Sequence, residues 1–145
     1  MRRVIRARNR SRVLGLRAQI SGMAGDLGDL VVWRESAQLA QGAIDAARRM
    51  SGFGTPAAAD QIARAAESIP ANIAEAYGRG FGKDGARFLR VARGSAAELE
   101  SHLWLAERTG GVPGQLAADL LRRTQHVRAL LRGLLQATAG GRSRG

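Results

Sequence analysis

Four stretches of this chain repeat apolar residues every three or four positions, and each stretch ends at a cluster of glycine or proline. This period is typical of amphipathic helices, and such clusters end them. The expected helices cover residues 29–50, 56–77, 84–108 and 114–138. Because helices of about 20 residues with short connections pack against their sequence neighbours, the pattern predicts an all-α, up-down-up-down four-helix bundle.

The apolar residues also predict which faces are buried. The expected core stripe of the first helix contains Leu30, Trp33, Ala37, Ala40, Ile44 and Ala47. Further apolar residues of the first and last helices fall outside the main stripes: Val31, Val32, Leu39, Leu121, Leu130 and Leu135. A lone bundle would leave that surface partly exposed, and exposed apolar patches commonly mark interfaces. The sequence therefore predicts a homo-oligomer.

Two of the predicted helices contain a residue that helices normally exclude. An interior proline such as Pro70 costs about 3 kcal/mol, and a glycine such as Gly94 costs about 1 kcal/mol relative to alanine. We expect a kink in the second helix at Pro70. We also expect the third helix to approach closely at Gly94, where Asn72 could reach it. Such contacts compensate the cost of both residues.

Polar residues around these positions are expected to form a structural seam between the two helices. The predicted seam residues are Ser68, Pro70, Asn72, Glu75, Gly94, Ser95 and Glu98. The alternative interpretation is a ligand or catalytic pocket in which Glu75 and Glu98 act as a carboxylate pair. No nucleophile and base accompany them in the sequence, so we expect no enzyme activity and no catalytic residues.

The formal net charge of +11 is concentrated near the ends of the sequence. Residues 1–25 contain seven Arg and no acid, residues 140–145 contain two Arg, and residues 26–139 carry only +2. We expect a disordered basic arm at 1–25, one bundle domain at 26–139 and a flexible basic tail at 140–145. Two alternatives for the arm are translation starting at Met23 and an organellar transit peptide, which is also rich in arginine and poor in acids.

A further group of basic residues surrounds the connection between the second and third helices. The up-down-up-down order would place it at the end of the bundle where both tails emerge. The predicted nucleic-acid-binding residues are Arg79, Lys83, Arg87, Arg90, Arg93, Arg128 and Arg132. A solvated charged face is the alternative interpretation. Contacts to phosphates supply affinity without base readout, so the pattern favours nonspecific binding of RNA or DNA.

Several chemistries lack their sequence signals. The chain has no cysteine and no Glu-x-x-His pair, so we expect no metal site and no cofactor. Gly78–Lys83 lacks the spacing of a phosphate-binding P-loop. No apolar run approaches the roughly 20 residues of a membrane span, and no secretory h-region is present. We therefore expect no membrane association and a cytoplasmic location.

Three motifs resemble those of the four-helix-bundle proteins encoded in intervening sequences of 23S rRNA genes. Asp29-Leu-Val-Val-Trp33 is similar to the start of that family's first helix. The second helix carries Gln61-Ile-Ala-Arg-Ala-Ala-Glu-Ser-Ile-Pro-Ala-Asn-Ile-Ala-Glu-Ala-Tyr-Gly-Arg79, and the third carries a similar motif from Phe88 to Glu100. Two departures are Ala76 in place of the usual Gly and a first connection without the family's charged Pro-Lys-Glu stretch.

The resemblance implies a bundle that assembles as a ring-shaped homopentamer and has no established catalytic activity. A weaker resemblance, without the Ser-Ile-Pro-Ala-Asn motif, links the chain to accessory proteins of diversity-generating retroelements. It implies a basic pentameric bundle that partners a reverse transcriptase and RNA. The predicted function is a non-enzymatic oligomer that binds nucleic-acid backbone, as an accessory to an RNA-processing or retroelement enzyme. The alternative is a protein–protein interaction scaffold with no nucleic-acid role.

Overall fold

The structure is a computed structural model that describes residues 26–50 and 56–140. Four long helices follow a short 3-10 turn, and no strand occurs in these ranges. The elements are η1 (Leu27–Asp29), α2 (Val31–Arg49), α3 (Pro56–Gly78), α4 (Lys83–Arg108) and α5 (Gly114–Gly140). The predicted all-α, four-helix fold is confirmed, with helix boundaries within two residues of those expected. The predicted arm at 1–25 and the tail after residue 140 lie outside the described residues.

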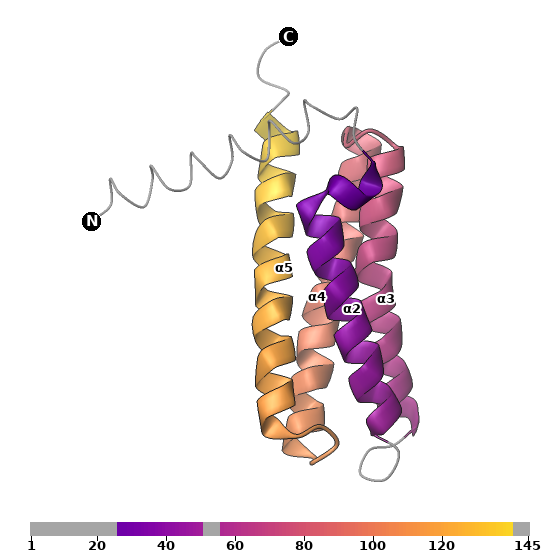
Figure 1. Ribbon diagram of the computed structural model, residues 1–145. Coiled ribbons are helices and arrows are strands. Elements are labelled where there is room, and N and C mark those ends of the chain that lie inside the picture. The colour runs from indigo at the N-terminus through magenta and orange to yellow at the C-terminus, as the bar shows by residue number, and fades with distance from the viewer. Residues whose placement is uncertain (1–25, 51–55, 141–145) are drawn as a thin grey trace, which may run out of the picture.

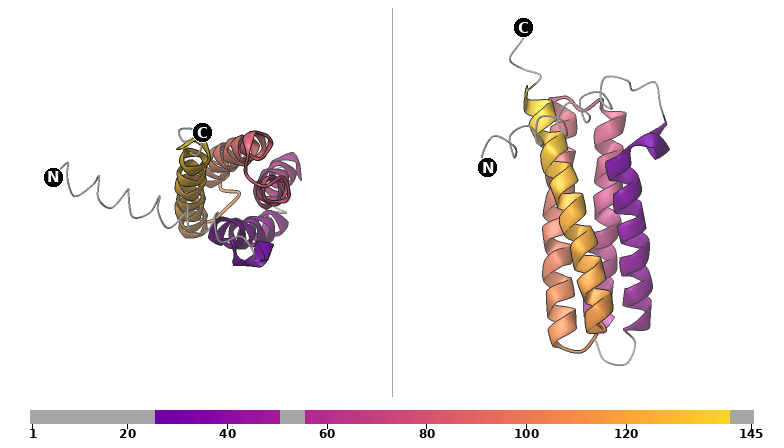
Figure 2. Two further views of the ribbon diagram at one scale, coloured as in Figure 1. Left: turned by 90° about the horizontal axis from the view of Figure 1, so that it is seen from above. Right: turned by 60° about the vertical axis from the view of Figure 1, so that its left-hand side comes forward.

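The four helices surround one core. α2 packs against α3 and α5, and α4 packs against the same two helices on the other side. Figure 2 shows this square arrangement in the view along the helices. α3 and α4 are connected at the end of the bundle where α2 begins and α5 finishes (Figure 1). Both predicted basic segments therefore attach to the molecule at that end.

The face that α2 buries differs from the predicted stripe. Trp33, Ala37 and Ile44 are only half-buried. The buried residues of α2 are Val32, Ser36, Leu39, Ala40, Ala43, Ala46 and Ala47. The prediction that Val32, Leu39 and Leu121 form an exposed surface is wrong, because all three are in the core of the single chain. Those residues therefore give no support for self-association.

The connection between α3 and α4 is anchored to the core. Phe81 is 4% exposed, and its ring meets that of Tyr77 edge-on at 6.2 Å between centroids. The Phe81 N–H donates to the carbonyl oxygen of Ala76 at 3.1 Å. The φ of Phe81 is +54°, which is unusual for a bulky residue and is held here by burial of the ring. This turn fixes where Arg79 and Lys83 lie.

The α3 and α4 backbones approach each other closely at Gly85. A Cβ added there would lie 3.0 Å from the carbonyl oxygen of Ala76. At Gly94 an added Cβ would meet nothing within 4 Å, and the residue is exposed. The predicted close contact at Gly94 is therefore wrong. Successive helix residues are rotated by about 100°, so Ser95 faces α3 while Gly94 faces outward.

Pro70 lies inside α3, and the helix continues through it from Pro56 to Gly78. A bend at this position stays a prediction. No helix in the described ranges combines the length and the apolar character that a bilayer span requires.

Candidate functional site

Three of the predicted seam residues are joined by hydrogen bonds. The hydroxyl oxygens of Ser68 on α3 and Ser95 on α4 lie 2.7 Å apart. The side-chain amide of Asn72 donates to the carbonyl oxygen of Ser68 at 2.7 Å and to its hydroxyl at 3.1 Å. Asn72 thus holds Ser68 within its own helix instead of reaching α4. The group is a structural link between the two helices, because its polar atoms bond one another.

The other predicted seam residues lie elsewhere. Glu75 accepts a hydrogen bond from Arg79 at 2.7 Å and is exposed. Gly94 and Glu98 are exposed on α4. Pro70 lines a groove between α2 and α3. The seam is therefore smaller than the sequence predicted, and Glu75 is bonded to an arginine instead of being paired with Glu98.

The strongest concentration of free positive charge is on the first three turns of α4. Lys83, Arg87, Arg90 and Arg93 are exposed, and none forms an ion pair within the part of the chain that the structure describes. We call these four residues the α4 basic face. Their spacing of three and four residues places them near one another on the helix surface.

A cavity of about 500 Å³ lies between the beginning of α4 and the end of α5. Lys83 and Arg90 line it from α4, and Leu135 and Thr138 line it from α5. Arg132 is exposed and precedes Leu135 by three residues, so it lies on the same face of α5. Residues from two helices therefore extend the α4 basic face across a shallow hollow that sequence analysis did not predict.

Arg79 is held in place by two carboxylates and a ring. Its guanidinium lies 2.7 Å from Glu75 and 3.4 Å from Asp84. It also stacks 4.7 Å above the ring centroid of Phe88. The hydrogen bond that Arg79 donates to Glu75 is the largest of several effects that raise the pKa of Arg79. Because both neighbours offset its charge, Arg79 contributes less to an anion-binding surface than the α4 basic face does.

Arg128 does not lie with this face. Its guanidinium forms an ion pair with Glu100, which lies in the second half of α4 and is largely buried. The predicted grouping of Arg128 with the basic end is wrong, because this pair places it further down the bundle.

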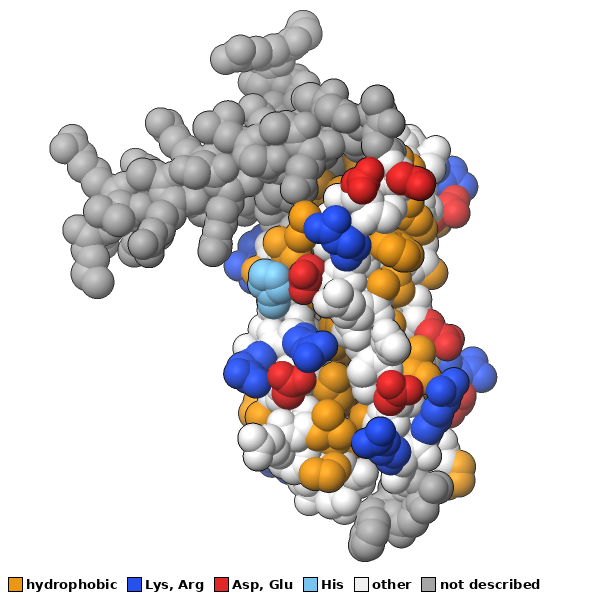
Figure 3. Space-filling view, in the orientation of Figure 1, with side chains coloured by type: hydrophobic (Ala, Val, Ile, Leu, Met, Phe, Trp, Pro, Cys, Tyr) orange, Lys and Arg blue, Asp and Glu red, His pale blue; other side chains and the backbone are white. Residues whose placement is uncertain are grey.

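The acidic residues near the opposite end of the bundle are mostly neutralised by arginines on the same helix. Asp45 pairs with Arg48, Asp60 with Arg64, and Asp119 with both Arg122 and Arg123. Figure 3 shows basic and acidic side chains interspersed over the face that carries α2. The end where α2 begins is itself not uniformly basic, because Asp26 and Asp29 form the capping box of η1 there. The candidate interface is therefore the α4 basic face and not a whole end.

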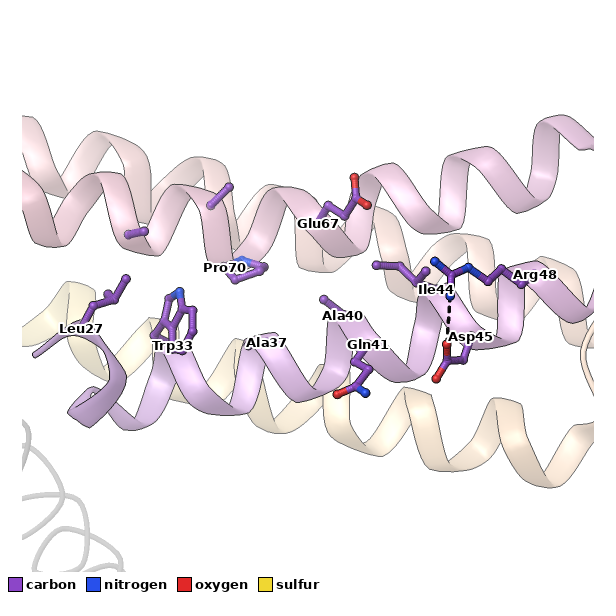
Figure 4. A pocket seen from close by; sticks show the side chains of 12 residues that line it. Leu27, Trp33, Ala37, Ala40, Gln41, Ile44, Asp45, Arg48, Glu67 and Pro70 are labelled. Atoms are coloured by element: carbon purple, nitrogen blue, oxygen red, sulfur yellow. Dashed lines mark ion pairs between the residues drawn. The ribbon is translucent and has the colours of Figure 1, made fainter.

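An open groove runs between α2 and α3, with a volume of about 650 Å³. Figure 4 shows Trp33, Ala37 and Ile44 of α2 along it, with Pro70 of α3 across from them. These are the α2 residues that the sequence pattern placed in the core. The sequence signal for the groove was present, because α2 carries two apolar faces, but the pattern does not tell which face meets the other helices.

The described residues contain no group of three or more His, Asp or Glu side chains that could hold a metal ion. The fold and the site define a small all-helical bundle with one basic helix face and an apolar groove.

The chain belongs to the family described as 23S rRNA-intervening sequence protein, whose family model matches residues 28–133. The resemblance stated above is thus confirmed. No curated protein matches the sequence.

Proposed function

We propose that this protein is a non-enzymatic, oligomeric helical bundle that binds the phosphate backbone of RNA or DNA without base readout. The oligomer is a homopentamer located in the cytoplasm. The protein acts as an accessory to an RNA-processing or retroelement enzyme. Membership in a family named for an rRNA intervening sequence is compatible with an RNA-related role.

The α4 basic face is the observation that carries the proposal. Several other arginines of the described bundle are neutralised by an aspartate on the same helix. Examples are Arg48, Arg64 and Arg122. Lys83, Arg87, Arg90 and Arg93 instead project into solvent from one helix. Unpaired cations in a row match the repeating charge of a nucleic-acid backbone, and neutralising phosphates releases condensed counterions. The arginines of 1–25 would add to the same attraction.

A second candidate function is a scaffold for another protein, without a nucleic-acid role. The groove between α2 and α3 favours it, because an open apolar groove flanked by two helices can receive a helix. The two functions differ in their dependence on salt, since an apolar contact does not release counterions.

Retention of nucleic acid tests the proposal. The full chain should bind single-stranded RNA and duplex DNA at about 50 mM salt and release both at several hundred mM. Scrambled sequences of equal length should compete equally, because phosphate contacts carry no base information. Absence of retention at the lower salt concentration, or strong preference for one base sequence, would contradict it.

A further inference from the structure

α4 carries an apolar surface that the described part of the chain leaves uncovered. The large hydrophobic side chains exposed in the described residues are Val91 at 46%, Trp104 at 46% and Leu105 at 60%. All three are on this helix. Val91 and Leu105 are fourteen residues apart, close to four turns, so they lie on the same side of α4. A surface of this kind on a small bundle commonly marks an interaction site.

Gly94 lies on this same side of α4. It is exposed in the middle of a 26-residue helix, and a side chain there would meet no atom within 4 Å. A glycine at such a position destabilises the helix by about 1 kcal/mol relative to alanine. No contact within residues 26–50 and 56–140 compensates for that cost. A second backbone approaching from outside would explain it, because glycine permits close contact.

The groove between α2 and α3 is the matching unfilled surface. Trp33, Ala37 and Ile44 line one side and Pro70 lines the other, with Glu67 at the rim (Figure 4). From Trp33 to Arg48 the groove follows about 22 Å of helix, at about 1.5 Å per residue. From Val91 to Leu105 the exposed surface of α4 covers about 21 Å by the same rise. The two surfaces therefore have matching lengths.

Their charges are also complementary. The groove is lined by two carboxylates and one guanidinium, from Asp45, Glu67 and Arg48. Of these, Glu67 forms no ion pair within the described ranges, whereas Asp45 pairs with Arg48 at 3.7 Å. On the same side of α4, Arg87 and Arg90 precede the glycine and Glu98 follows it; all three are exposed and without an ion pair in the described ranges. In such a contact Arg87 or Arg90 would pair with Glu67 of the second copy, and the phosphate contacts of the assembled protein would come from the remaining residues of the α4 basic face.

We infer that the occupant of the groove is α4 of a second copy, packed with Gly94 against the groove floor and Val91 and Leu105 on either side along the helix. This inference rests on the oligomeric part of the proposed function and names the contact that builds it. The two surfaces lie on different helices, so the contact is heterologous. Repetition of a heterologous contact closes into a ring when the rotation permits. Each copy then buries both of its uncovered apolar surfaces.

Two substitutions at exposed positions test this contact in the full chain. Ala71 of α3 lines the groove, so Ala71→Arg blocks it, and Gly94→Arg blocks the face of α4. Each should convert the assembled protein to a monomer of 15.4 kDa by light scattering. Ala129→Arg is the matched control, because it adds the same charge at an exposed alanine of α5 and should leave the mass unchanged. Unchanged helicity by circular dichroism verifies folding, and Glu67→Arg and Leu105→Glu serve as second variants of the two surfaces.

Mixing the two monomeric variants distinguishes a heterologous contact from a symmetric one. Gly94→Arg retains an intact groove and Ala71→Arg retains an intact α4 face, so each pair can form one contact and no more. The mixture should contain a one-to-one dimer of twice 15.4 kDa. A mixture that stays monomeric overturns the heterologous arrangement.

The remaining outcomes separate this inference from the proposed function. Assembled Ala71→Arg and Gly94→Arg proteins would overturn the α4–groove contact and leave oligomerisation standing. A monomeric wild type would overturn both the α4–groove contact and oligomerisation. This holds whether the groove is then empty or filled by another segment or another protein. None of these masses depends on nucleic acid, so phosphate binding is judged by its own experiment.

Discussion

Replacing Lys83, Arg87, Arg90 and Arg93 together with glutamine is expected to weaken RNA binding on the order of a hundredfold near 100 mM salt. Each side chain is exposed and unpaired in the described part of the chain, so each is free to neutralise a phosphate. About 0.7 units of salt slope are lost per contact on single strands, so the log–log slope should flatten by roughly 3. Fluorescence anisotropy over a salt series measures both quantities.

The matched control replaces Arg48, Arg64, Arg122 and Arg123 with glutamine. It removes the same net charge, but each of these arginines is already paired with an aspartate. Its affinity should fall much less. Equal losses in the two variants would mean that only total charge matters and would contradict a defined interface on α4. Light scattering on both variants checks that they have the same oligomeric state before their affinities are compared.

The second large effect concerns two glycines on one helix. Gly85→Leu should lower the free energy of unfolding by about 1–3 kcal/mol or more, because overpacking forces backbone shifts. The obstacle is the carbonyl oxygen of Ala76, 3.0 Å from the added Cβ, and a backbone oxygen cannot rotate away. Gly94→Leu should instead stabilise the single chain by roughly 0.5–1 kcal/mol, because leucine favours helix over glycine.

Chemical denaturation at submicromolar protein concentration measures both values with little contribution from self-association. The comparison is internally controlled, because the substitution and the helix are the same. Equal destabilisation by the two variants would show that α4 tolerates no larger residue at either position. It would also contradict the inference that the glycine at position 94 permits close contact with a second copy.

The helices were predictable because their signals are local. Pro56 begins α3, and Gly110 with a φ of +75° follows the end of α4. The buried face of α2 was not predictable from period alone. Trp33 and Leu39 each belong to an apolar stripe with helical spacing, and alanines fill both stripes. Which stripe enters the core depends on how α2 is rotated against α3 and α5, and that is a property of the whole bundle.

In the candidate site, too, local features were predictable from the sequence and contacts between helices were not. Exposure of Lys83, Arg87 and Arg90 follows from their positions opposite the buried Leu89 and Ala92 on α4. The ion pair between Arg128 and Glu100 joins residues that are 28 apart in sequence, so no local sequence pattern predicts it. The contact at Gly85 likewise depends on the turn that Phe81 anchors. Sequence analysis therefore predicted the exposed positions of Lys83, Arg87 and Arg90 on α4, and it misplaced Arg128, whose position depends on a contact between two helices.

Phosphate binding by the folded bundle is best measured on the chain that begins at Asp26, which lacks the seven arginines of the preceding residues. The described helices and their core all lie after that point, and circular dichroism verifies that they fold. We expect this chain to bind single-stranded RNA at about 50 mM salt, with a slope that the α4 substitutions reduce by roughly 3. If it shows no binding there while the full chain binds, the bundle has no phosphate interface of its own.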